Sequence, residues 1–315
     1  MLGCIRIISL SKFQSKYLKN VCLSRYRFLN DSASDPSLKW TSRTHWCGKL
    51  RECNVGEQVQ LTGWIQFNRL HKKFVLIRDA TGVVQLIIPE EGNAGRIARE
   101  RLKEATAESS IKAIGTVKLR PDGDSNPALQ TGSVEVEVQN IEFVNPAITS
   151  LPFLPSRVTN EGKEPLRMKY RSLDLRRQDL QNNLRLRSNV VMKMRQFLCN
   201  HGFVDIETPT LFRRTPGGAR EFIVPTRHKG KFYSLVQSPQ QFKQMLMVGG
   251  FDKYFQIARC YRDEGAKPNR QPEFTQVDIE MAWSDPRSIQ ECIEEMLIYC
   301  WPEHLSEGSI NKENG

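Results

Sequence analysis

Two kinds of hydrophobic pattern divide the chain. Between about residues 58 and 144, apolar positions alternate with polar ones, as at Val59, Leu61 and Ile65. This period of two is typical of strands with one buried face, because successive side chains point to opposite faces. From about residue 184 onward, several segments instead carry apolar residues at helical spacing. The pattern therefore predicts a β domain followed by a mixed domain, an α+β chain overall.

Five strands and one helix are predicted in the first half. The second and third strands pair across Ala80-Thr81-Gly82, and Val134 to Val138 alternates without a break. Three strands, a helix and two strands are the order of an OB-fold β-barrel, which binds single-stranded nucleic acid on its strand face. The strands begin near residues 59, 74, 83, 111 and 134, and the helix covers 94–107.

Three helices and one strand are predicted in the second half, in addition to a hairpin. The first helix covers 184–198 and stops at Gly202, and a strand at 203–211 ends near Pro209. The second helix starts with Ser238 as N-cap, Pro239 at the first helical position and Gln241 closing a capping box, and Gly249-Gly250 ends it. The third follows Asp285 as N-cap, with an apolar stripe of Ile289, Ile293, Met296 and Leu297.

A hairpin with a polar face follows the second of these helices. Its strands are 254–262 and 273–283. Thr275, Val277, Ile279 and Met281 share one face, predicted to be core, and Phe274, Gln276, Asp278 and Glu280 share the other. A half-buried strand normally avoids carboxylates unless a ligand lies there. With Arg262 at the tip, this face suits a small zwitterion beside a phosphate. The alternative is an ordinary hairpin with a solvated face.

The composition favours a polyanionic partner. The net charge of the 315-residue chain is +11 and its pI is about 9.3, which indicates nucleic acid or an anionic surface. No apolar run is long enough to span a bilayer. The 8 cysteines include no C-x-x-C pair, and His45, Cys47 and Cys53 match no zinc spacing. We therefore expect reduced cysteines, no protein-bound metal site and no membrane association.

The N-terminal segment has the composition of a targeting sequence. Residues 1–30 contain six lysines and arginines and no acidic residue. Such a basic, acid-free and partly apolar start is typical of a cleavable mitochondrial transit peptide. It predicts localisation in the mitochondrial matrix, and the alternative is a disordered basic tail. Residues 32–37 read as a linker.

Two sequence motifs resemble those of a known enzyme family. The segments 261–264 (YRDE) and 270–276 (RQPEFTQ) resemble motif 2 of class II aminoacyl-tRNA synthetases. The segments 237–240 (QSPQ) and 242–244 (FKQ) resemble the amino-acid-binding region of aspartyl-tRNA synthetases of bacterial type. The resemblance implies an N-terminal OB-fold barrel followed by the first part of a class II catalytic domain built on an antiparallel sheet.

The resemblance also implies a reaction and the residues that serve it. ATP and aspartate would form aspartyl-adenylate, and the aspartyl group would pass to an aspartate-specific tRNA, with Mg²⁺ as cofactor. Arg262 would grip the α-phosphate and the substrate carboxylate, and Lys243 would pair with the side-chain carboxylate. Residues assigned to the amino acid are Ser238, Gln240, Lys243, Arg262 and Asp278, those assigned to ATP are Arg262, Asp263, Glu264, Gln271 and Phe274, and Arg262 and Glu264 are the catalytic candidates.

In the barrel, the resemblance implies anticodon binding. Phe74 would stack on an anticodon base, and Gln85 and Glu108 would read base edges. Arg69 is a weaker match, because the loop before Phe74 is shorter than in the bacterial pattern. The alternative for Phe74 is a plain core position.

The resemblance divides the chain as follows: residues 1–40 transit peptide and linker, 44–145 anticodon-binding barrel, 146–182 hinge, 183–302 partial catalytic domain and 303–315 a tail that matches nothing in the family. Motif 1, the helix and strand of 184–211, would form a homodimer interface. In the loop 215–221 the sequence departs from the family, because Gly217 stands where a glutamate is common. Asp278 then remains as the main anion for the substrate amino group.

Three alternatives stay open at this point. Family members continue for hundreds of residues, and the missing part would hold motif 3 and most Mg²⁺ ligands. We therefore expect a chain truncated after motif 2, with little or no activity alone. The other possibilities are a non-catalytic tRNA-binding or dimerising isoform, and an asparagine-accepting or lysine-specific relative. The segment 237–240 argues against lysine.

Overall fold

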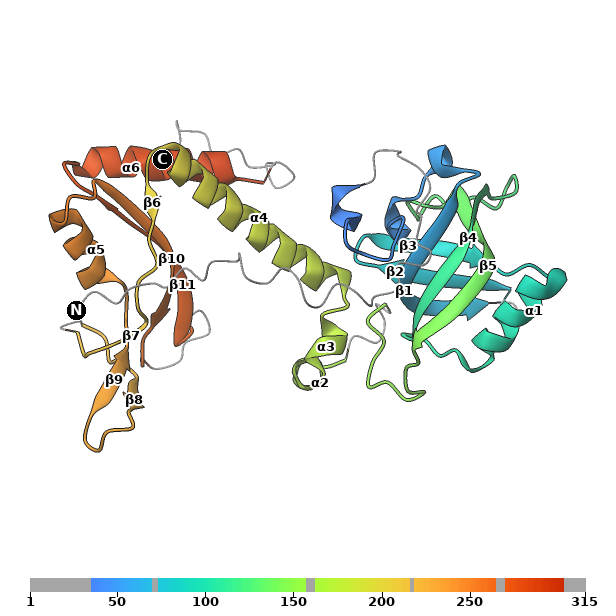
Figure 1. Ribbon diagram of the computed structural model, residues 1–315, viewed down its shortest axis with the longest axis horizontal. Coiled ribbons are helices and arrows are strands. Elements are labelled where there is room, and N and C mark those ends of the chain that lie inside the picture. The colour runs from blue at the N-terminus through green and yellow to red at the C-terminus, as the bar shows by residue number, and fades with distance from the viewer. Residues whose placement is uncertain (1–34, 70–72, 157–161, 216–217, 265–269, 303–315) are drawn as a thin grey trace, which may run out of the picture. The chain divides into compact units, whose positions relative to one another are not determined.

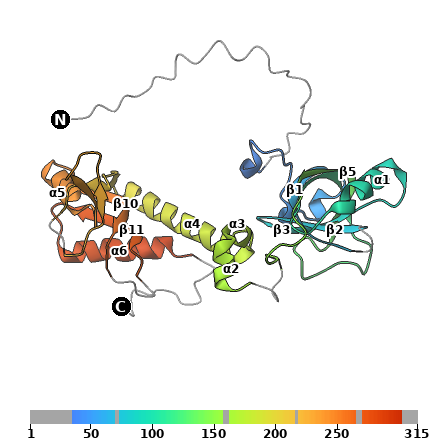
Figure 2. The same ribbon diagram turned by 90° about the horizontal axis from the view of Figure 1, so that it is seen from below.

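The computed structural model describes residues 35–69, 73–156, 162–215, 218–264 and 270–302. The chain divides into two compact units, Met1–Tyr170 and Arg171–Gly315. Each unit has its own hydrophobic core. Figures 1 and 2 show the helices and strands of both units. The mixture of helices and strands agrees with the predicted α+β class.

The first unit is built on a closed five-stranded barrel with the strand order β1-β2-β3-β5-β4. All pairs are antiparallel except β3 with β5, which is parallel. The strands are β1 (Gln58–Arg69), β2 (Phe74–Asp79), β3 (Gly82–Ile87), β4 (Ser110–Leu119) and β5 (Val134–Asn145). Short 3₁₀ helices surround it: η2 (Pro36–Leu38), η3 (Cys47–Lys49), η4 (Glu52–Asn54) and η5 (Leu102–Glu104).

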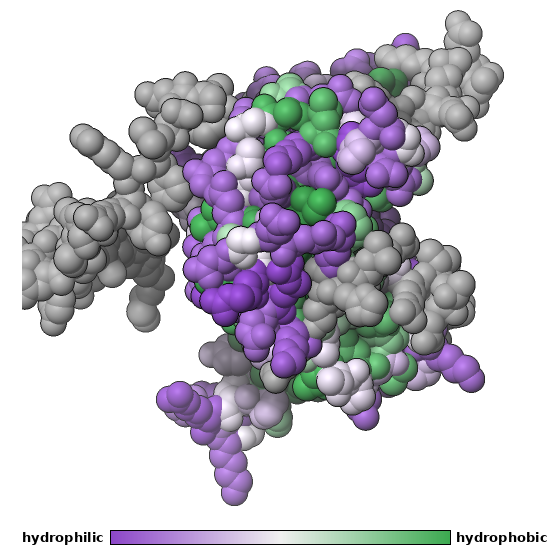
Figure 3. Space-filling view, turned by 90° about the vertical axis from the view of Figure 1, so that its right-hand side faces the viewer, coloured by the Kyte–Doolittle hydropathy of each residue, from purple (hydrophilic) through white to green (hydrophobic). Residues whose placement is uncertain are grey.

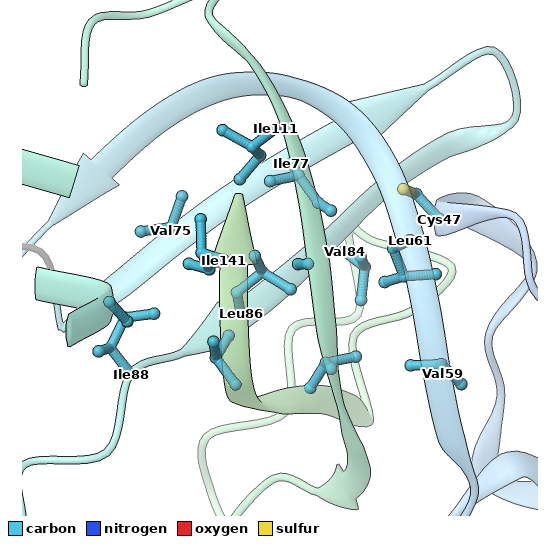
Figure 4. Packing of buried hydrophobic residues seen from close by; sticks show 14 of the residues in the cluster. Cys47, Val59, Leu61, Val75, Ile77, Val84, Leu86, Ile88, Ile111 and Ile141 are labelled. Carbon is cyan, nitrogen blue, oxygen red and sulfur yellow. The ribbon is translucent and has the colours of Figure 1, made fainter. Parts of the chain in front are cut away.

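The barrel interior is filled by side chains from alternate positions. Val59, Leu61 and Ile65 of β1 are completely buried, as the period of two predicts. Figure 4 shows Val59 and Leu61 among the other buried side chains of the barrel. Gly63 occupies the remaining inward position of that strand, where an added Cβ would lie 2.5 Å from the carbonyl oxygen of Arg78. A larger residue there would push β1 and β2 apart.

On the face seen in Figure 3, most of the described surface is hydrophilic, with apolar residues scattered between.

The helix predicted at 94–107 is shorter than expected. Helix α1 covers Gly92–Arg101, and the chain then tightens into η5. The reason lies a few residues later, where Glu108 adopts the left-handed backbone conformation (φ 69°) and its N–H donates to the carbonyl of Ile65 at 2.7 Å. That turn brings the chain into β4, so the helical pattern ends early.

The second unit contains two small sheets and the longer helices. One sheet has the order β11-β10-β6, with β10 (Lys253–Tyr261) antiparallel to β11 (Glu273–Met281) and parallel to β6 (Val204–Asp205). The other has the order β7-β9-β8, formed by Leu211–Phe212, Phe232–Leu235 and Ile223–Pro225. The helices are α3 (Arg171–Asp174), α4 (Gln178–Asn200), α5 (Gln240–Val248) and α6 (Pro286–Cys300), and α2 (Glu164–Lys169) closes the first unit.

The core of the second unit lies between the β10–β11 hairpin and the helices α4 and α6 (Figures 1 and 2). Phe255, Val277, Ile279 and Met281 face Phe197 and Leu198 of α4 and Met296 and Cys300 of α6. The strand face predicted to be core is therefore confirmed as core. The opposite face of the hairpin lies toward α5, whose Lys243 contacts β11.

Four local predictions need correction. The strand predicted at 203–211 is only two residues long in β6, after which Ile206 N–H and the Thr208 side chain still bond to β10 before the chain turns toward β7. Helix α4 starts at Gln178, before the predicted 184. The N-cap of α5 is Pro239 and makes no side-chain hydrogen bond, so the predicted Ser238 capping box is wrong. In α6, Ile293 and Met296 are packed, but Ile289 and Leu297 are 43% and 40% exposed.

Candidate active site

The polar face of the hairpin gathers the residues that the sequence pattern grouped. In the register of β10 and β11, Asp278 lies opposite Gln256, Glu280 opposite Tyr254 and Phe274 opposite Cys260. Because paired residues of antiparallel strands share a face, the side chains of both strands converge toward α5. This face therefore presents a linear array of aromatic, amide and carboxylate groups, with Arg262 following the end of β10.

Lys243 of α5 joins this face through two ion pairs. Its Nζ lies 2.9 Å from Oδ1 of Asp278 and 3.0 Å from Oε2 of Glu280. The Lys243 and Asp278 side chains are only 12% and 9% exposed. Burial acts to lower the pKa of Lys243, but hydrogen bonds to Asp278 and Glu280 outweigh it and leave the pKa above its usual value. The lysine is therefore held charged between two carboxylates.

Arg262 and Phe274 form the other end of the site. The guanidinium carbon of Arg262 lies 5.1 Å from the centre of the Phe274 ring, and Arg262 N–H donates to the carbonyl of Pro272 at 2.9 Å. Nε of Arg262 is buried and has no hydrogen-bond partner within the part of the chain that the structure describes. A buried donor of this kind is costly unless a ligand accepts from it. An anion such as phosphate fits that requirement.

The remaining predicted site residues lie at the rim. Asp263 and Glu264 are exposed after β10, and Glu264 makes a long contact of 4.0 Å with Arg270. Gln240, at the start of α5, and Gln271 are also exposed, and Ser238 is half-buried just before α5. The structure thus brings Arg262 to Phe274 and Lys243 to Asp278. Within the described residues, the other five make no hydrogen bond or ion pair with these four side chains.

The loop before β8 is fixed by two residues that sequence reasoning did not single out. Glu221 accepts hydrogen bonds from both the N–H and the hydroxyl of Thr215. The Gln237 amide donates to the carbonyl of Ala219 at 2.7 Å and accepts from its N–H at 3.1 Å. Burial acts to raise the pKa of Glu221, but the bonds from Thr215 outweigh it and lower the pKa. Gly217, the position that departs from the family, lies outside the described residues.

Buried groups of β10 lie on the same polar face, opposite the residues of β11. The Gln256 amide is bonded to the Tyr254 hydroxyl at 2.8 Å and to Thr208 Oγ1 at 2.9 Å. Burial, reinforced by the negative charge of Asp278, raises the pKa of Tyr254. Burial also raises the pKa of Cys260 to about 11, and its thiol donates to Gln276 Oε1 at 3.2 Å. Cys260 therefore stays protonated near neutral pH and is no nucleophile.

In the barrel, the four anticodon candidates have different surroundings. Phe74 is half-buried, and Lys73 Nζ lies 5.8 Å from the centre of its ring. Gln85 Nε2 donates to Glu135 Oε2 at 2.8 Å across β3 and β5. Arg69 pairs through its backbone with Phe74, and its side chain lies outside what the structure describes.

Glu108 is the most buried of the anticodon candidates whose side chains the structure describes. Its side chain is fully buried, and both carboxylate oxygens accept from Arg78 Nη2 at 2.6 Å. Arg78 in turn lies 5.6 Å from the Trp64 ring centre. The carboxylate that accepts from Gln85 is Glu135, which is itself only 5% exposed.

No metal cluster accompanies the site. Over the described ranges, no group of three or more His, Cys, Asp or Glu residues could hold a metal ion. The residues present therefore do not fit the Mg²⁺ that the family resemblance implied, and no chemical step is assigned to it. Within the same ranges, no helix is both long and apolar enough to cross a membrane.

Comparison with known proteins shows first which class of proteins the chain is similar to. The family described as "tRNA synthetases class II (D, K and N)" matches residues 163–313. A solved asparaginyl-tRNA synthetase from Pyrococcus horikoshii, complexed with asparaginyl-adenylate, superposes with a TM-score of 0.69 at 26% identity, covering 81% of this chain and 57% of that one. An aspartyl-tRNA synthetase structure from Leishmania major, at 24% identity and a TM-score of 0.71, shares the fold. Residues 163–313 of this chain are therefore similar to the class II tRNA synthetases.

Relatives of known name then show which members of this class the chain is similar to. The chain is 54% identical over 283 residues to the mitochondrial aspartate–tRNA ligase of Homo sapiens and 52% identical over 282 residues to that of Rattus norvegicus. A bacterial aspartate–tRNA(Asp/Asn) ligase from Corynebacterium jeikeium is 46% identical over 266 residues. In the human and rat comparisons, the match covers 89% of this chain and 43% of the relative. The chain thus spans less than half the length of these relatives.

Proposed function

We propose that this chain carries the aspartate and ATP site of an aspartate–tRNA ligase that acts in mitochondria. The observation that carries the proposal is the cation Lys243, held between Asp278 and Glu280 at one end of a polar face that has Arg262 over Phe274 at the other. Such a face can accept an amino acid with a carboxylate side chain beside an adenine nucleotide. The names of the human and rat relatives support the same substrate.

Each end of the aspartate would meet a group of complementary charge. Lys243 Nζ would bind the side-chain carboxylate, and Asp278 would receive the substrate ammonium. Both side chains are largely buried and already held in place by their contact, so little reorganisation is required. Because asparagine carries a neutral amide in place of that carboxylate, Lys243 would favour aspartate. Ser238 and Gln240 would contact the amino acid from the start of α5.

The chemistry requires positioning and charge neutralisation more than proton transfer. An oxygen of the aspartate α-carboxylate attacks the α-phosphorus of ATP, and the bond to pyrophosphate breaks. Arg262, with its unpaired buried Nε, would neutralise the charge that develops on the phosphoryl oxygens. Phe274 would stack on adenine, and Asp263, Glu264 and Gln271 would contact the nucleotide from the rim.

In the second step, the terminal ribose hydroxyl of tRNA attacks the aspartyl carbonyl carbon. AMP leaves, and the hydroxyl proton passes to solvent or to a phosphate oxygen. The barrel would select the tRNA as an OB-fold, with Phe74 stacking on a base and Gln85 reading a base edge. Motif 1, now α4 and β6, is the proposed homodimer surface.

The domain division stays part of this proposal. Its boundaries are the transit segment to residue 40, the barrel at 44–145, the hinge at 146–182, the catalytic part at 183–302 and the tail at 303–315. The asparagine-accepting, lysine-specific and non-catalytic alternatives have less support, since the human and rat relatives are named for aspartate alone.

The test is calorimetric binding of non-hydrolysable sulfamoyl analogues of aspartyl-, asparaginyl- and lysyl-adenylate to the purified chain. We expect the aspartyl analogue to bind most tightly. Lys243→Met should remove most of its advantage over the asparaginyl analogue, because the carboxylate loses its cation. Lys229→Met, an exposed lysine in the same unit, is the control. Equal affinity for the aspartyl and asparaginyl analogues in the unmodified chain would refute aspartate selectivity.

A further inference from the structure

We propose that the β8–β9 hairpin is a second RNA-binding surface, which grips the phosphate backbone of tRNA outside the anticodon. This inference rests on the proposed function, since it takes tRNA to be the substrate. The surface consists of the hairpin 223–235 and the two arginines that follow β7, and it is called the basic hairpin below.

The basic hairpin is strongly cationic and contains no compensating charge. The segment from Phe222 to Leu235 has no acidic residue. Its cations, together with the two arginines after β7, are all exposed: Arg213, Arg214, Arg227, Lys229 and Lys231. His228 is also exposed. Within the described chain, none of these side chains makes an ion pair with a carboxylate.

Several other cations of the second unit already have carboxylate partners. Arg177 pairs with Asp179, Arg259 with Glu273 and Arg287 with Glu291. Arg195 pairs with Asp205. The basic hairpin instead brings five exposed cations together, none with a carboxylate partner among the described residues, and such a cluster attracts an external polyanion.

The turn that carries the cations is held in one conformation. Thr226 Oγ1 donates to the carbonyl of Lys231 at 2.8 Å and accepts from His228 N–H at 3.1 Å. Lys231 N–H donates to the carbonyl of His228 at 3.1 Å, and Gly230 supplies the left-handed conformation (φ 76°) that closes the turn. The cations are therefore presented from a fixed backbone, so binding orders only their side chains.

Two exposed aromatic side chains favour RNA over a membrane as the partner. Phe232 and Tyr233 are 61% and 49% exposed. They are consecutive in β9, so they point to opposite faces of the sheet. Insertion into a bilayer needs apolar groups gathered on one face. Aromatic rings on both faces beside lysines and arginines instead suit the bases and phosphates of a nucleic acid.

The basic hairpin is connected to the active site through backbone hydrogen bonds. β9 pairs with β7 through Leu235 and Leu211, and the chain continues directly to Val236. Tyr261 N–H of β10 donates to the carbonyl of Val236 at 3.1 Å, one residue before Arg262. RNA bound on the hairpin is thus held by the same unit, on a strand that leads to the phosphate-binding arginine.

The test measures the dissociation constant of labelled aspartate tRNA between 50 and 200 mM salt. We compare the unmodified chain with Arg227→Gln/Lys229→Gln and with a control, Arg259→Gln/Arg287→Gln, whose side chains are exposed but already paired with Glu273 and Glu291. Each lost phosphate contact lowers the slope of log K against log salt by about 1. We expect the hairpin variant to lower the slope by about 2 and the control to leave it unchanged. The loss should be equal for a tRNA with a scrambled anticodon.

The outcomes separate this inference from the proposed function. An unchanged slope in the hairpin variant, with anticodon-dependent binding intact, overturns the basic hairpin and leaves the function standing. No tRNA binding by the unmodified chain overturns both. Binding to phosphatidylserine vesicles that is lost in the hairpin variant, while its tRNA slope is unchanged, would identify a membrane as the partner and overturn the inference.

Discussion

At the scale of single residues, Lys243 has more partners than its motif indicates. The resemblance assigned Lys243 and Asp278 to opposite ends of the substrate, yet they lie 2.9 Å apart, with Glu280 beside them. The two carboxylates hold the lysine charged in a partly dry site. When aspartate binds, its own charged groups would replace some of these internal contacts. Because Glu280 is one of the groups that contact Lys243, we expect it to contribute to recognition, although the motif gave it no role.

The pH dependence of stability tests this cluster. Because the pKa of Lys243 is raised above 10.5 in the folded chain, its ion pairs stabilise the fold in full below pH 10.5 and are lost as pH rises through the raised value. Lys243→Met should reduce the free energy of unfolding by about 3 kcal/mol at pH 8. Urea denaturation at pH 8, 9.5 and 11.5 should show a constant difference at the first two values and a smaller one at the third. A difference that grows with pH would contradict the assignment.

Phe74 carries a second prediction at this scale. Since a stacked base contributes about 1–3 kcal/mol, Phe74→Ala should weaken aspartate tRNA binding by that amount. The same substitution should have little effect on a tRNA with a scrambled anticodon. Leu119→Ala is the control, because Leu119 is 55% exposed on another strand of the barrel. If Phe74 were only a core residue, its removal would lower the melting temperature and leave the preference for the cognate anticodon intact.

At the scale of elements, capping and periodicity had different predictive value. Asp285 accepts from Ser288 N–H at 2.7 Å and starts α6 as its sequence predicts. The start of α5 was misplaced by the same reasoning, since its N-cap is Pro239. A cap is a single local bond, so a strand that leads into the helix can shift it by one residue. Periodicity, which sums many positions, identified the buried face of β11 correctly.

Helix α4 provides a matched test of packing. Leu198 is completely buried against the second core, whereas Leu184 on the same helix is 55% exposed. Leu198→Ala should destabilise the second unit by about 2–5 kcal/mol, because it leaves a cavity. Leu184→Ala should change the stability by less than about 0.5 kcal/mol. Chemical denaturation followed by circular dichroism measures both. Similar losses for the two would mean that α4 packs differently.

At the scale of the whole molecule, the chain combines two separately built cores with a basic N-terminal segment. The barrel core contains no residue of the second unit, and the second core none of the barrel. Their separation fits a division of labour in which one unit selects the tRNA and the other holds the reactants. The segment 1–34 lies outside the described residues, and its predicted role rests on its composition.

The localisation proposal is tested by import into isolated mitochondria. Deleting residues 1–40 should abolish protease-protected uptake, because the acid-free basic segment is lost. Changing only the lysines and arginines of residues 1–30 to glutamine should have the same effect and controls for length. Uptake of the shortened chain at the original rate would rule out this segment as the import signal.

The sequence by itself determined the elements and their faces. Alternation in 59–65, 134–138 and 273–281 and the helical spacing before Gly202 depend only on which residues must avoid water, so they can be read locally. Motif spacing likewise indicated the family, and with it Arg262, Phe274, Lys243 and Asp278.

Only the tertiary structure decided which polar groups meet. Arg78 and Glu108 are 30 residues apart and Gln85 and Glu135 are 50 apart, yet each pair is in direct contact. Both carboxylates of these pairs, Glu108 and Glu135, are therefore buried and held by a side chain from another part of the barrel. The unpaired cations of the basic hairpin could also be recognised only after the partners of the other cations were known. Long-range pairing depends on how strands close into a sheet, and no local pattern encodes the distance between two charges that the chain brings together only on folding.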